Sequence, residues 1–212
     1  RTVHAVQIQR GEVRTIEAVL RSVPEGFCVV GNGNHIFAIQ QNPVSVGEYL
    51  VFLNAIPHHD AKNHLPVLHD GRAYMEFGDG LWRLLEADSE GDHWDPDWPM
   101  FIVSYLDSQA YAQWFGKLHG VAARLPTVAE WEFAARGETQ RRYPWGDYFD
   151  PSFCVMRESP RNLGTPSLLS ETTADVSPLG VRHMSGNIGN WTSTMRGNRI
   201  VYKGACYKSM AE

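Results

Sequence analysis

Three residue types with reactive side chains, cysteine, tyrosine and serine, lie close together near the end of the sequence. Cys206, Tyr207 and Ser209 lie within four consecutive positions. An ionised thiol is a nucleophile and a soft metal ligand, but most single cysteines pack as small, partly buried side chains. Taken by itself, the sequence therefore favours a packed thiol over a nucleophile at Cys206.

Two other segments carry groups that bind metals in many proteins. Four histidines, His58, His59, His64 and His69, lie in one stretch. Their spacing does not place them on one face of a helix, so we expect solvent-exposed loop histidines. The segment 90–98 is acidic and aromatic, but its acids lack the regular spacing of a calcium loop. We expect a solvated loop there, with its tryptophans packed inward.

Periodic patterns predict the elements that must position these groups. We expect strands at 27–30, 35–39, 73–77 and 81–85, and helices at 46–54, 104–118 and 127–136. Ser45 and Glu48 have the spacing of a capping box at a helix start. The same spacing recurs in Thr127 and Glu130. The chain after Gly137 is rich in turn residues, and helices followed by an irregular, strand-containing half indicate an α+β fold.

Length and composition indicate one globular domain. The chain has 212 residues, of which 43% are hydrophobic and 20% are charged, and this suits a single packed domain. Residues 1–22 alternate polar and apolar types, so we expect leading strands or a linker from an upstream domain there. Residues 23–212 are expected to form the main domain.

Charge and hydropathy exclude two kinds of partner. The formal net charge is −5 and the sequence has no basic tract, so nucleic acid is not expected. No apolar run reaches the ~20 residues of a membrane helix, so a membrane is not expected either. The three cysteines, Cys28, Cys154 and Cys206, are widely spaced and odd in number. This pattern does not suggest a disulfide framework, and we expect a cytoplasmic protein.

Several longer motifs occur in an order that is specific for one protein family. The first are Pro-Val-Ser-Val-Gly-Glu-Tyr at 43–49, Asp-Ser-Gln-Ala-Tyr-Ala-Gln-Trp at 107–114, and the run at 124–137. Tyr-Pro-Trp-Gly-Asp follows at 143–147, and Gly-Val-Arg-His-Met-Ser-Gly-Asn-Ile at 180–188. Through these motifs the chain resembles the formylglycine-generating, sulfatase-modifying family. The resemblance implies an α+β, C-type-lectin-like fold, with two helices packed on short irregular antiparallel strands.

The first departure from the family lies in a motif that helps to hold calcium. The family has Gly-Asn followed by aliphatic-Trp-Glu-Trp. In this chain Gly189 takes the place of the first tryptophan, and Asn190 takes the place of the glutamate. Exchanging a carboxylate for an amide weakens an oxygen-ligand site. The resemblance still implies Asn187 as a candidate calcium ligand, and calcium is the one cofactor that we expect could bind.

The second departure concerns catalysis. The family has an Arg-Gly-Gly-Ser-aromatic motif with catalytic cysteines just after it. Here Cys206 falls on the serine of the motif, and Ser209 falls on the first catalytic cysteine. The resemblance implies thiolates as soft ligands of Cu(I) in the oxidases of the family. Because this cysteine pair is missing from the pattern, we expect no catalytic residues and no enzymatic activity.

The departures gather near the end of the chain, and this favours a recognition surface. The chain also resembles a non-catalytic branch of this family, the variable proteins of diversity-generating retroelements, whose C-terminal face is diversified to bind ligands. The resemblance implies a face for an unknown protein or small-molecule ligand. We expect this face to contain Gly189, Asn190, Ser193, Thr194, Asn198, Tyr202, Cys206, Tyr207 and Ser209. Small polar and tyrosyl side chains of this kind also dominate antibody loops.

Two alternatives remain at this point. One is a formylglycine-generating oxidase that acts on a sulfatase cysteine. The other follows from segments 90–99 and 150–159, which resemble family domains fused to bacterial serine/threonine kinases. That resemblance implies a sensor or interaction domain with an upstream kinase domain as its partner.

Overall fold

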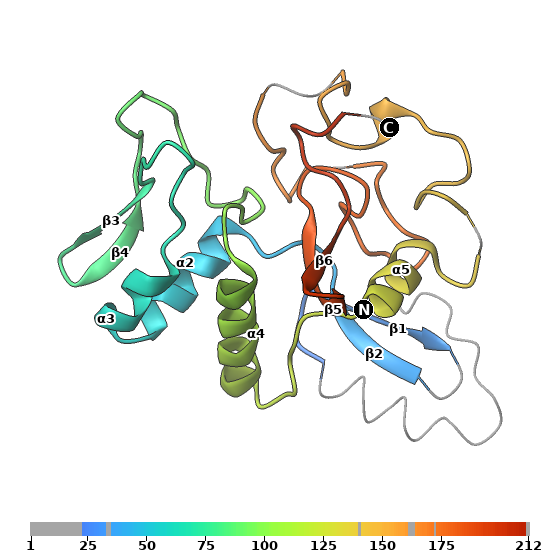
Figure 1. Cartoon of the computed structure of the whole chain (residues 1–212), viewed down its shortest axis with the longest axis horizontal. Helices are drawn as coiled ribbons and strands as arrows, with labels where there is room; N and C mark the ends of the chain where they lie inside the picture. The colour runs from blue at the N-terminus through green and yellow to red at the C-terminus, as the bar shows by residue number, and fades with distance from the viewer. Residues whose placement is uncertain (1–22, 33–34, 140, 161–163, 172, 211–212) are drawn as a thin grey trace. The chain divides into compact units, whose positions relative to one another are not determined.

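The computed structural model describes residues 23–32, 35–139, 141–160, 164–171 and 173–210 (Figure 1). The strands or linker expected at 1–22 lie outside these described residues. The chain divides into two compact units. Unit 1 contains Arg1–Pro43, Pro126–Thr165 and Thr172–Glu212, and unit 2 contains Val44–Leu125 and Pro166–Glu171.

Unit 2 begins with α2 (Val46–Ala55), and its start confirms the predicted capping box. Ser45 Oγ accepts a hydrogen bond from the Glu48 N–H at 3.1 Å, and Glu48 Oε2 accepts one from the Ser45 N–H at 2.8 Å. These bonds satisfy backbone donors that a helix start leaves without partners. The buried side chains of α2, which lead into the core of unit 2, are Val46, Tyr49, Phe52 and Leu53.

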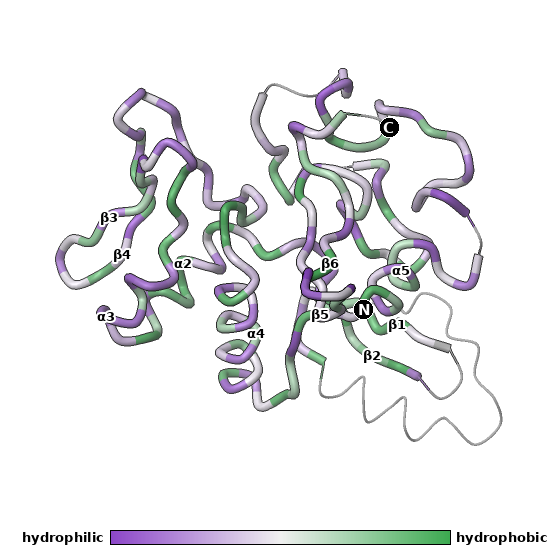
Figure 2. The backbone as a smooth tube through the Cα atoms, in the orientation of Figure 1, coloured by the Kyte–Doolittle hydropathy of each residue, from purple (hydrophilic) through white to green (hydrophobic). Residues whose placement is uncertain are grey.

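The second long helix of unit 2 is α4 (Tyr105–His119), which has capping groups at both ends. Ser104 and Asp107 form a capping box, and Gly120 ends the helix in the left-handed region with φ 65°. A glycine reaches this conformation without the steric cost of a side chain. Figure 2 shows hydrophobic and hydrophilic residues alternating around α4, as expected for a helix that packs on one face.

A short hairpin completes the core of unit 2. Strands β3 (Met75–Gly78) and β4 (Leu81–Leu84) pair antiparallel, as the sequence predicted. Asn54 of α2 fixes the hairpin, because its Nδ2 donates to the Trp82 carbonyl at 3.0 Å and its Oδ1 accepts from the Trp82 N–H at 2.7 Å. Trp82 is thereby held in the hydrophobic cluster of unit 2, which also contains the buried side chains of α2.

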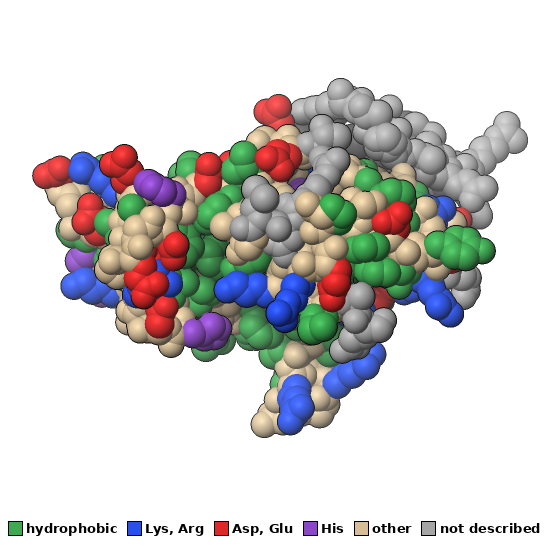
Figure 3. All heavy atoms as spheres, turned by 90° about the horizontal axis from the view of Figure 1, so that it is seen from above, with side chains coloured by type: hydrophobic (Ala, Val, Ile, Leu, Met, Phe, Trp, Pro, Cys, Tyr) green, Lys and Arg blue, Asp and Glu red, His purple; other side chains and the backbone are tan. Residues whose placement is uncertain are grey.

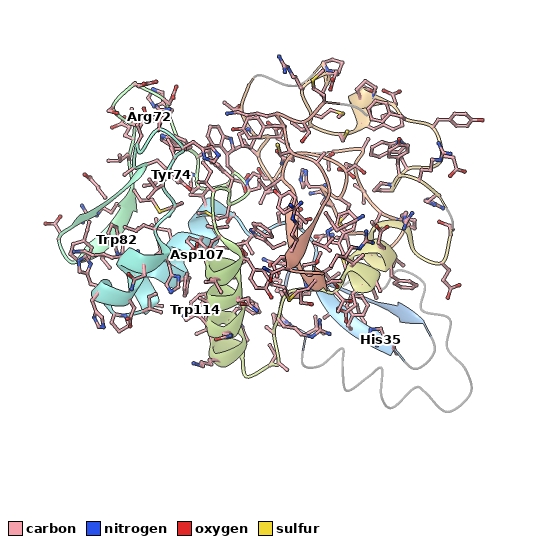
Figure 4. All side chains as sticks on the ribbon, in the orientation of Figure 1. His35, Arg72, Tyr74, Trp82, Asp107 and Trp114 are labelled. Carbon is pink, nitrogen blue, oxygen red and sulfur yellow. The ribbon has the colours of Figure 1, made fainter. Side chains whose placement is uncertain are left out.

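The loop histidines are more tightly packed than the sequence suggested. Two short helical turns, α3 (His58–Ala61) and η1 (Lys62–His64), occupy this segment. His64 Nδ1 lies 2.8 Å from Oδ1 of Asp107, a residue of α4 that is labelled in Figure 4. The His58 ring stacks on Trp82, with 5.3 Å between ring centroids. His59 is exposed, as expected. The difference arises because the local spacing could not reveal partners from α4 and β4.

The acidic loop of unit 2 is organised around one arginine. Arg72 contacts the carboxylates of Asp70 at 2.8 Å, Asp88 at 2.6 Å and Asp92 at 3.0 Å. Acidic side chains accordingly gather on the surface shown in Figure 3. Trp94 packs against the core of unit 2, so the predicted inward packing of tryptophan is confirmed.

Unit 1 has its core between a strand pair and one helix. Strands β1 (Phe27–Asn32) and β2 (His35–Gln40) pair antiparallel, as predicted. Helix α5 (Val128–Arg136) starts at the predicted capping box of Thr127 and Glu130. The buried cluster beneath them contains Val30, Trp131, Ala134, Ala135, Val181 and Met184.

The irregular half of unit 1 ends in a second antiparallel pair. After the short turn η2 (Pro151–Phe153), strands β5 (Asn190–Arg196) and β6 (Arg199–Lys203) form a hairpin with an irregular register (Figure 1). Short antiparallel pairs and separate helices confirm the α+β class, whereas the C-type-lectin likeness stays a prediction. Among the described residues, none of the helices has the length and apolar character that crossing a bilayer requires.

Candidate functional site

The turn after β6 brings a thiol and a hydroxyl into contact. Ser209 Oγ donates a hydrogen bond to Cys206 Sγ at 3.4 Å, and it accepts one from the Cys206 N–H at 3.0 Å. The Ser209 N–H closes the turn by donating to the Cys206 carbonyl at 2.9 Å. Both residues are only partly buried. We call residues Cys206 to Ser209 the site turn.

The other two cysteines are packed thiols. Burial raises the pKa of Cys154 to about 12, and the carboxylates of Asp175 and Asp150 add to the rise. Burial also raises the pKa of Cys28. A thiol that stays protonated is a poor nucleophile. Among the three cysteines, Cys206 is therefore the one best placed for chemistry.

Two segments of unit 1 hold the site turn through main-chain bonds. The Tyr207 N–H donates to the Asn187 carbonyl at 3.1 Å, and the Arg157 N–H donates to the Ser209 carbonyl at 3.0 Å. Asn187 is fully buried, and its φ of 69° lies in the left-handed region. Asparagine adopts this region more readily than most residues. The position of the thiol is thus set by segments far from it in sequence.

Tyr202 of β6 lies over Gly189, the glycine that replaces the tryptophan of the family pattern. A Cβ added to Gly189 would overlap the Tyr202 ring. The ring also meets Trp191 edge-on, with 5.1 Å between centroids. Burial and then the nearby Cys206 raise the pKa of Tyr202, so its phenol stays protonated at neutral pH. Gly189, Trp191 and Tyr202 therefore form one cluster.

We predict that Gly189→Ala lowers the free energy of unfolding by about 1–3 kcal/mol, because the new methyl group must displace the Tyr202 ring. The change should be measured by urea unfolding. Gly78→Ala is the matched control, since a Cβ there meets nothing within 4 Å. The double variant with Tyr202→Ala should recover part of the loss. If Gly189→Ala lowers the free energy of unfolding as much in the Tyr202→Ala background as in the wild-type protein, overlap with the Tyr202 ring is excluded as the cause.

Asn190 and its neighbours fix the strand pair on α5. Trp131 Nε1 donates to Asn190 Oδ1 at 2.9 Å, so the amide that replaces the family's glutamate has a structural partner. Lys203 forms an ion pair with Glu132 and lies 5.3 Å from the centroid of the Trp131 ring. These contacts place β6, and hence the site turn, relative to α5.

Other residues of the predicted face lie apart from the site turn. The Ser193 N–H donates to the Pro126 carbonyl at 2.8 Å. Thr194 Oγ1 accepts a hydrogen bond from the Val128 N–H at 2.9 Å. Asn198 is exposed in the turn between β5 and β6. Ser193 and Thr194 thus support the start of α5, and whether any of these residues contacts a ligand stays a prediction.

The buried acid Asp175 is the main feature that the sequence did not reveal. Only 1% of its surface is exposed. Its Oδ2 accepts the N–H groups of Ser185 at 2.7 Å and Gly186 at 3.1 Å. Burial nevertheless outweighs these bonds and raises the pKa of Asp175 to about 6. One signal in the sequence that could have indicated a role for Asp175 is its position shortly before the turn-rich run at 180–188.

The residues of the site turn do not fit the copper centre that the resemblance implies. Two thiolates would be needed, and Cys206 instead faces the hydroxyl of Ser209. Within the described ranges, no three His, Cys, Asp or Glu side chains gather as a metal site. For calcium, Asn187 Nδ2 lies 3.4 Å from His183 Nδ1, and a calcium role for Asn187 stays a prediction.

The fold and the site define an α+β protein with a thiol and a hydroxyl on a C-terminal turn. The family model described as "Sulfatase-modifying factor enzyme 1-like domain" matches residues 5–212. The chain therefore belongs to the formylglycine-generating, sulfatase-modifying family, which confirms the resemblance seen in the sequence.

Three relatives illustrate the range of the family. The formylglycine-generating enzyme of Mycobacterium tuberculosis is 38% identical over 105 residues, 45% of this chain and 33% of that protein. The hercynine oxygenase of Mycolicibacterium thermoresistibile is 36% identical over 107 residues, 47% of this chain and 21% of that protein. The serine/threonine-protein kinase pkn1 of Chlamydia pneumoniae is 29% identical over 160 residues, 74% of this chain and 22% of that protein. The matched regions thus span about a third or less of each relative.

A solved structure supports the fold. PvdO from Pseudomonas aeruginosa superimposes with a TM-score of 0.59 over 87% of this chain and 80% of that chain, at 19% identity. At this identity the likeness concerns the fold alone.

The prediction that the chain is not an enzyme is wrong. The family description names an enzyme, and two of the relatives are named as an enzyme and an oxygenase. The prediction relied on the absence of the family's catalytic cysteine pair, with Ser209 at the first of the two positions. The relation to retroelement variable proteins stays a prediction.

Proposed function

We propose that this chain is part of an enzyme that oxidises a cysteine thiol of a polypeptide substrate with dioxygen as the oxidant, and that Cys206 is its reactive thiol. The observation that carries the proposal is the contact between Cys206 Sγ and Ser209 Oγ at 3.4 Å. The family pattern has serine at the first of these positions and cysteine at the second. This chain has the two groups exchanged, so one thiol and one hydroxyl remain in the same turn.

The surroundings of Cys206 support a role for its thiolate. The Ser209 hydroxyl donates to the sulfur, and a hydrogen bond from a donor stabilises an anion more than a neutral thiol. Tyr202, whose pKa is raised by burial and then by Cys206, contributes a phenol that stays protonated. We propose that the exposed part of this cluster contacts the substrate. The likeness to a formylglycine-generating enzyme favours a sulfatase-type cysteine as the substrate group.

The test is the oxidation of a peptide with a sulfatase-type cysteine under dioxygen, with and without added copper, followed by mass spectrometry. We predict that Cys206→Ser lowers turnover at least about a hundredfold, because the reactive group is removed. Cys28→Ser is the control and should leave turnover within about twofold. Turnover that survives in Cys206→Ser would exclude the role of this thiol, and no turnover in the unchanged chain would exclude the activity.

A second proposal concerns the protein in which the domain works. We propose that the chain follows a serine/threonine kinase domain and binds a ligand or partner for it. The likeness to pkn1, over 74% of this chain, favours this arrangement. The test is the reading frame upstream of the coding sequence. An in-frame kinase domain supports the proposal, and a start codon without such a domain rejects it. This arrangement is compatible with catalysis at Cys206.

A further inference from the structure

Asp175 stands out among the buried charged groups because two consecutive N–H groups donate to its carboxylate. Ser185 and Gly186 donate to Oδ2 at 2.7 and 3.1 Å. The His183 N–H donates to the Asp175 carbonyl at 2.9 Å. Successive N–H groups that converge on one anion form a main-chain nest, which fixes the conformation of the segment that supplies them. We call residues Met184 to Asn187 the nest loop.

The nest loop has little freedom to move as a whole. A Cβ on Gly186 would lie 2.6 Å from the Val155 carbonyl oxygen and 2.8 Å from its nitrogen, so the two main chains are in direct contact. The Asn187 N–H donates to the same Val155 carbonyl at 2.7 Å. The loop is therefore held between Asp175 on one side and the segment at Val155 on the other.

The nest loop in turn supports the site turn. Its Asn187 carbonyl accepts the Tyr207 N–H at 3.1 Å. A Cβ on Gly204, just before the site turn, would lie 3.1 Å from the Met184 carbonyl oxygen. Thus both ends of the nest loop meet the chain on either side of Cys206.

We propose that Asp175 is a positioning residue for Cys206: its carboxylate fixes the nest loop, and the nest loop holds the thiol against Ser209. Asp175 itself is 1% exposed and acts without contact to substrate. Its Oδ1 is buried with no hydrogen-bond partner. An uncompensated buried oxygen costs stability, and the organisation of the nest loop gives a reason to keep a carboxylate there.

The first test is alkylation of Cys206 in folded protein, followed peptide by peptide with Cys28 as the internal reference. We expect Asp175→Ala to raise the alkylation rate of Cys206 at least about fivefold relative to Cys28, because a loosened turn opens locally. Asp175→Asn should stay near the wild-type ratio, since its amide oxygen can accept the same N–H groups. If Asp175→Ala does not fold, Asp175→Ser takes its place with the same expectation.

A general loss of stability is separated from positioning by Leu53→Ala. Leu53 is 0% exposed in the core cluster of unit 2, and this cluster contains no residue of the nest loop or the site turn. This variant should leave the alkylation ratio unchanged. An equal rise in Leu53→Ala, or an unchanged ratio in Asp175→Ala and Asp175→Ser, overturns the proposal.

For turnover, the inference rests on the proposed function, whereas alkylation tests it independently. Asp175→Ala should lower kcat about tenfold with little change in KM, because binding groups remain while the thiol is misplaced. If Cys206 proves dispensable for turnover but its alkylation follows Asp175, only the proposed function fails. If turnover needs Cys206 but neither kcat nor alkylation follows Asp175, only the positioning role fails.

Discussion

Replacing Trp131 with alanine is expected to lower the free energy of unfolding by about 3–5 kcal/mol. Trp131 is 7% exposed and lies in the buried cluster of unit 1. The change removes the apolar area of the ring and leaves a cavity. It also removes the N–H donor of Asn190 Oδ1 and the ring beneath Lys203. Because these contacts hold β5 and β6 on α5, the site turn should loosen as well.

Urea unfolding followed by circular dichroism measures this loss. Trp145→Ala is the matched control, since Trp145 is only partly buried and stacks on Tyr143; we expect it to cost about 1–2 kcal/mol. Trp131→Phe keeps most of the area but removes the bond to Asn190, and should cost about 1 kcal/mol. A loss in Trp131→Ala no larger than in Trp145→Ala would show that the ring is not central to the core.

The second large effect is a pH dependence of stability that depends on Asp175. Burial raises the pKa of this acid from 3.8 to about 6 in the folded protein. Between these values the folded state binds more protons than the unfolded state at this group, so the stabilising contribution of Asp175 is fully present below about pH 4 and is lost as pH rises through 6. A shift of about 2 pH units corresponds to on the order of 3 kcal/mol.

The measurement is the difference in unfolding free energy between wild type and Asp175→Asn at several values from pH 4 to pH 7.5. Since asparagine does not titrate, this difference should change by on the order of 3 kcal/mol across the range in favour of the variant at high pH. Asp150→Asn serves as the contrasting control. Hydrogen bonds from Ser152 lower the pKa of Asp150, so its contribution is lost as pH falls. A pH-independent difference for Asp175→Asn would contradict the assignment.

Local sequence determined the elements and the family. The capping boxes at Ser45 and Thr127 could be predicted because helix starts depend on side chains within three residues. The hairpins β1–β2 and β3–β4 follow from alternation and turn residues. Family motifs spread over most of the chain gave the fold class, since they reflect the whole arrangement and not one contact.

The sequence identified the residues of the candidate site but not the contact between them. Cys206 and Ser209 were identified as departures from a pattern, but the sequence treated each position separately. Only the turn geometry showed that the two exchanged groups touch, at 3.4 Å. Likewise the sequence predicted Gly189 as part of a recognition face, and only the structure showed that Tyr202 from the opposite strand lies over this glycine.

What the sequence by itself determined is therefore what depends on neighbours along the chain: helix starts, strand pairs, and the motifs that define a sulfatase-modifying type of fold. What only the tertiary structure decided is what depends on groups brought from afar. Asp175 accepts hydrogen bonds from the N–H groups of a loop about ten residues later in the chain. The site turn forms main-chain hydrogen bonds with Asn187 and Arg157. The physical reason is that buried main-chain donors must find partners in the folded chain, and their spacing in sequence does not say which partner they find.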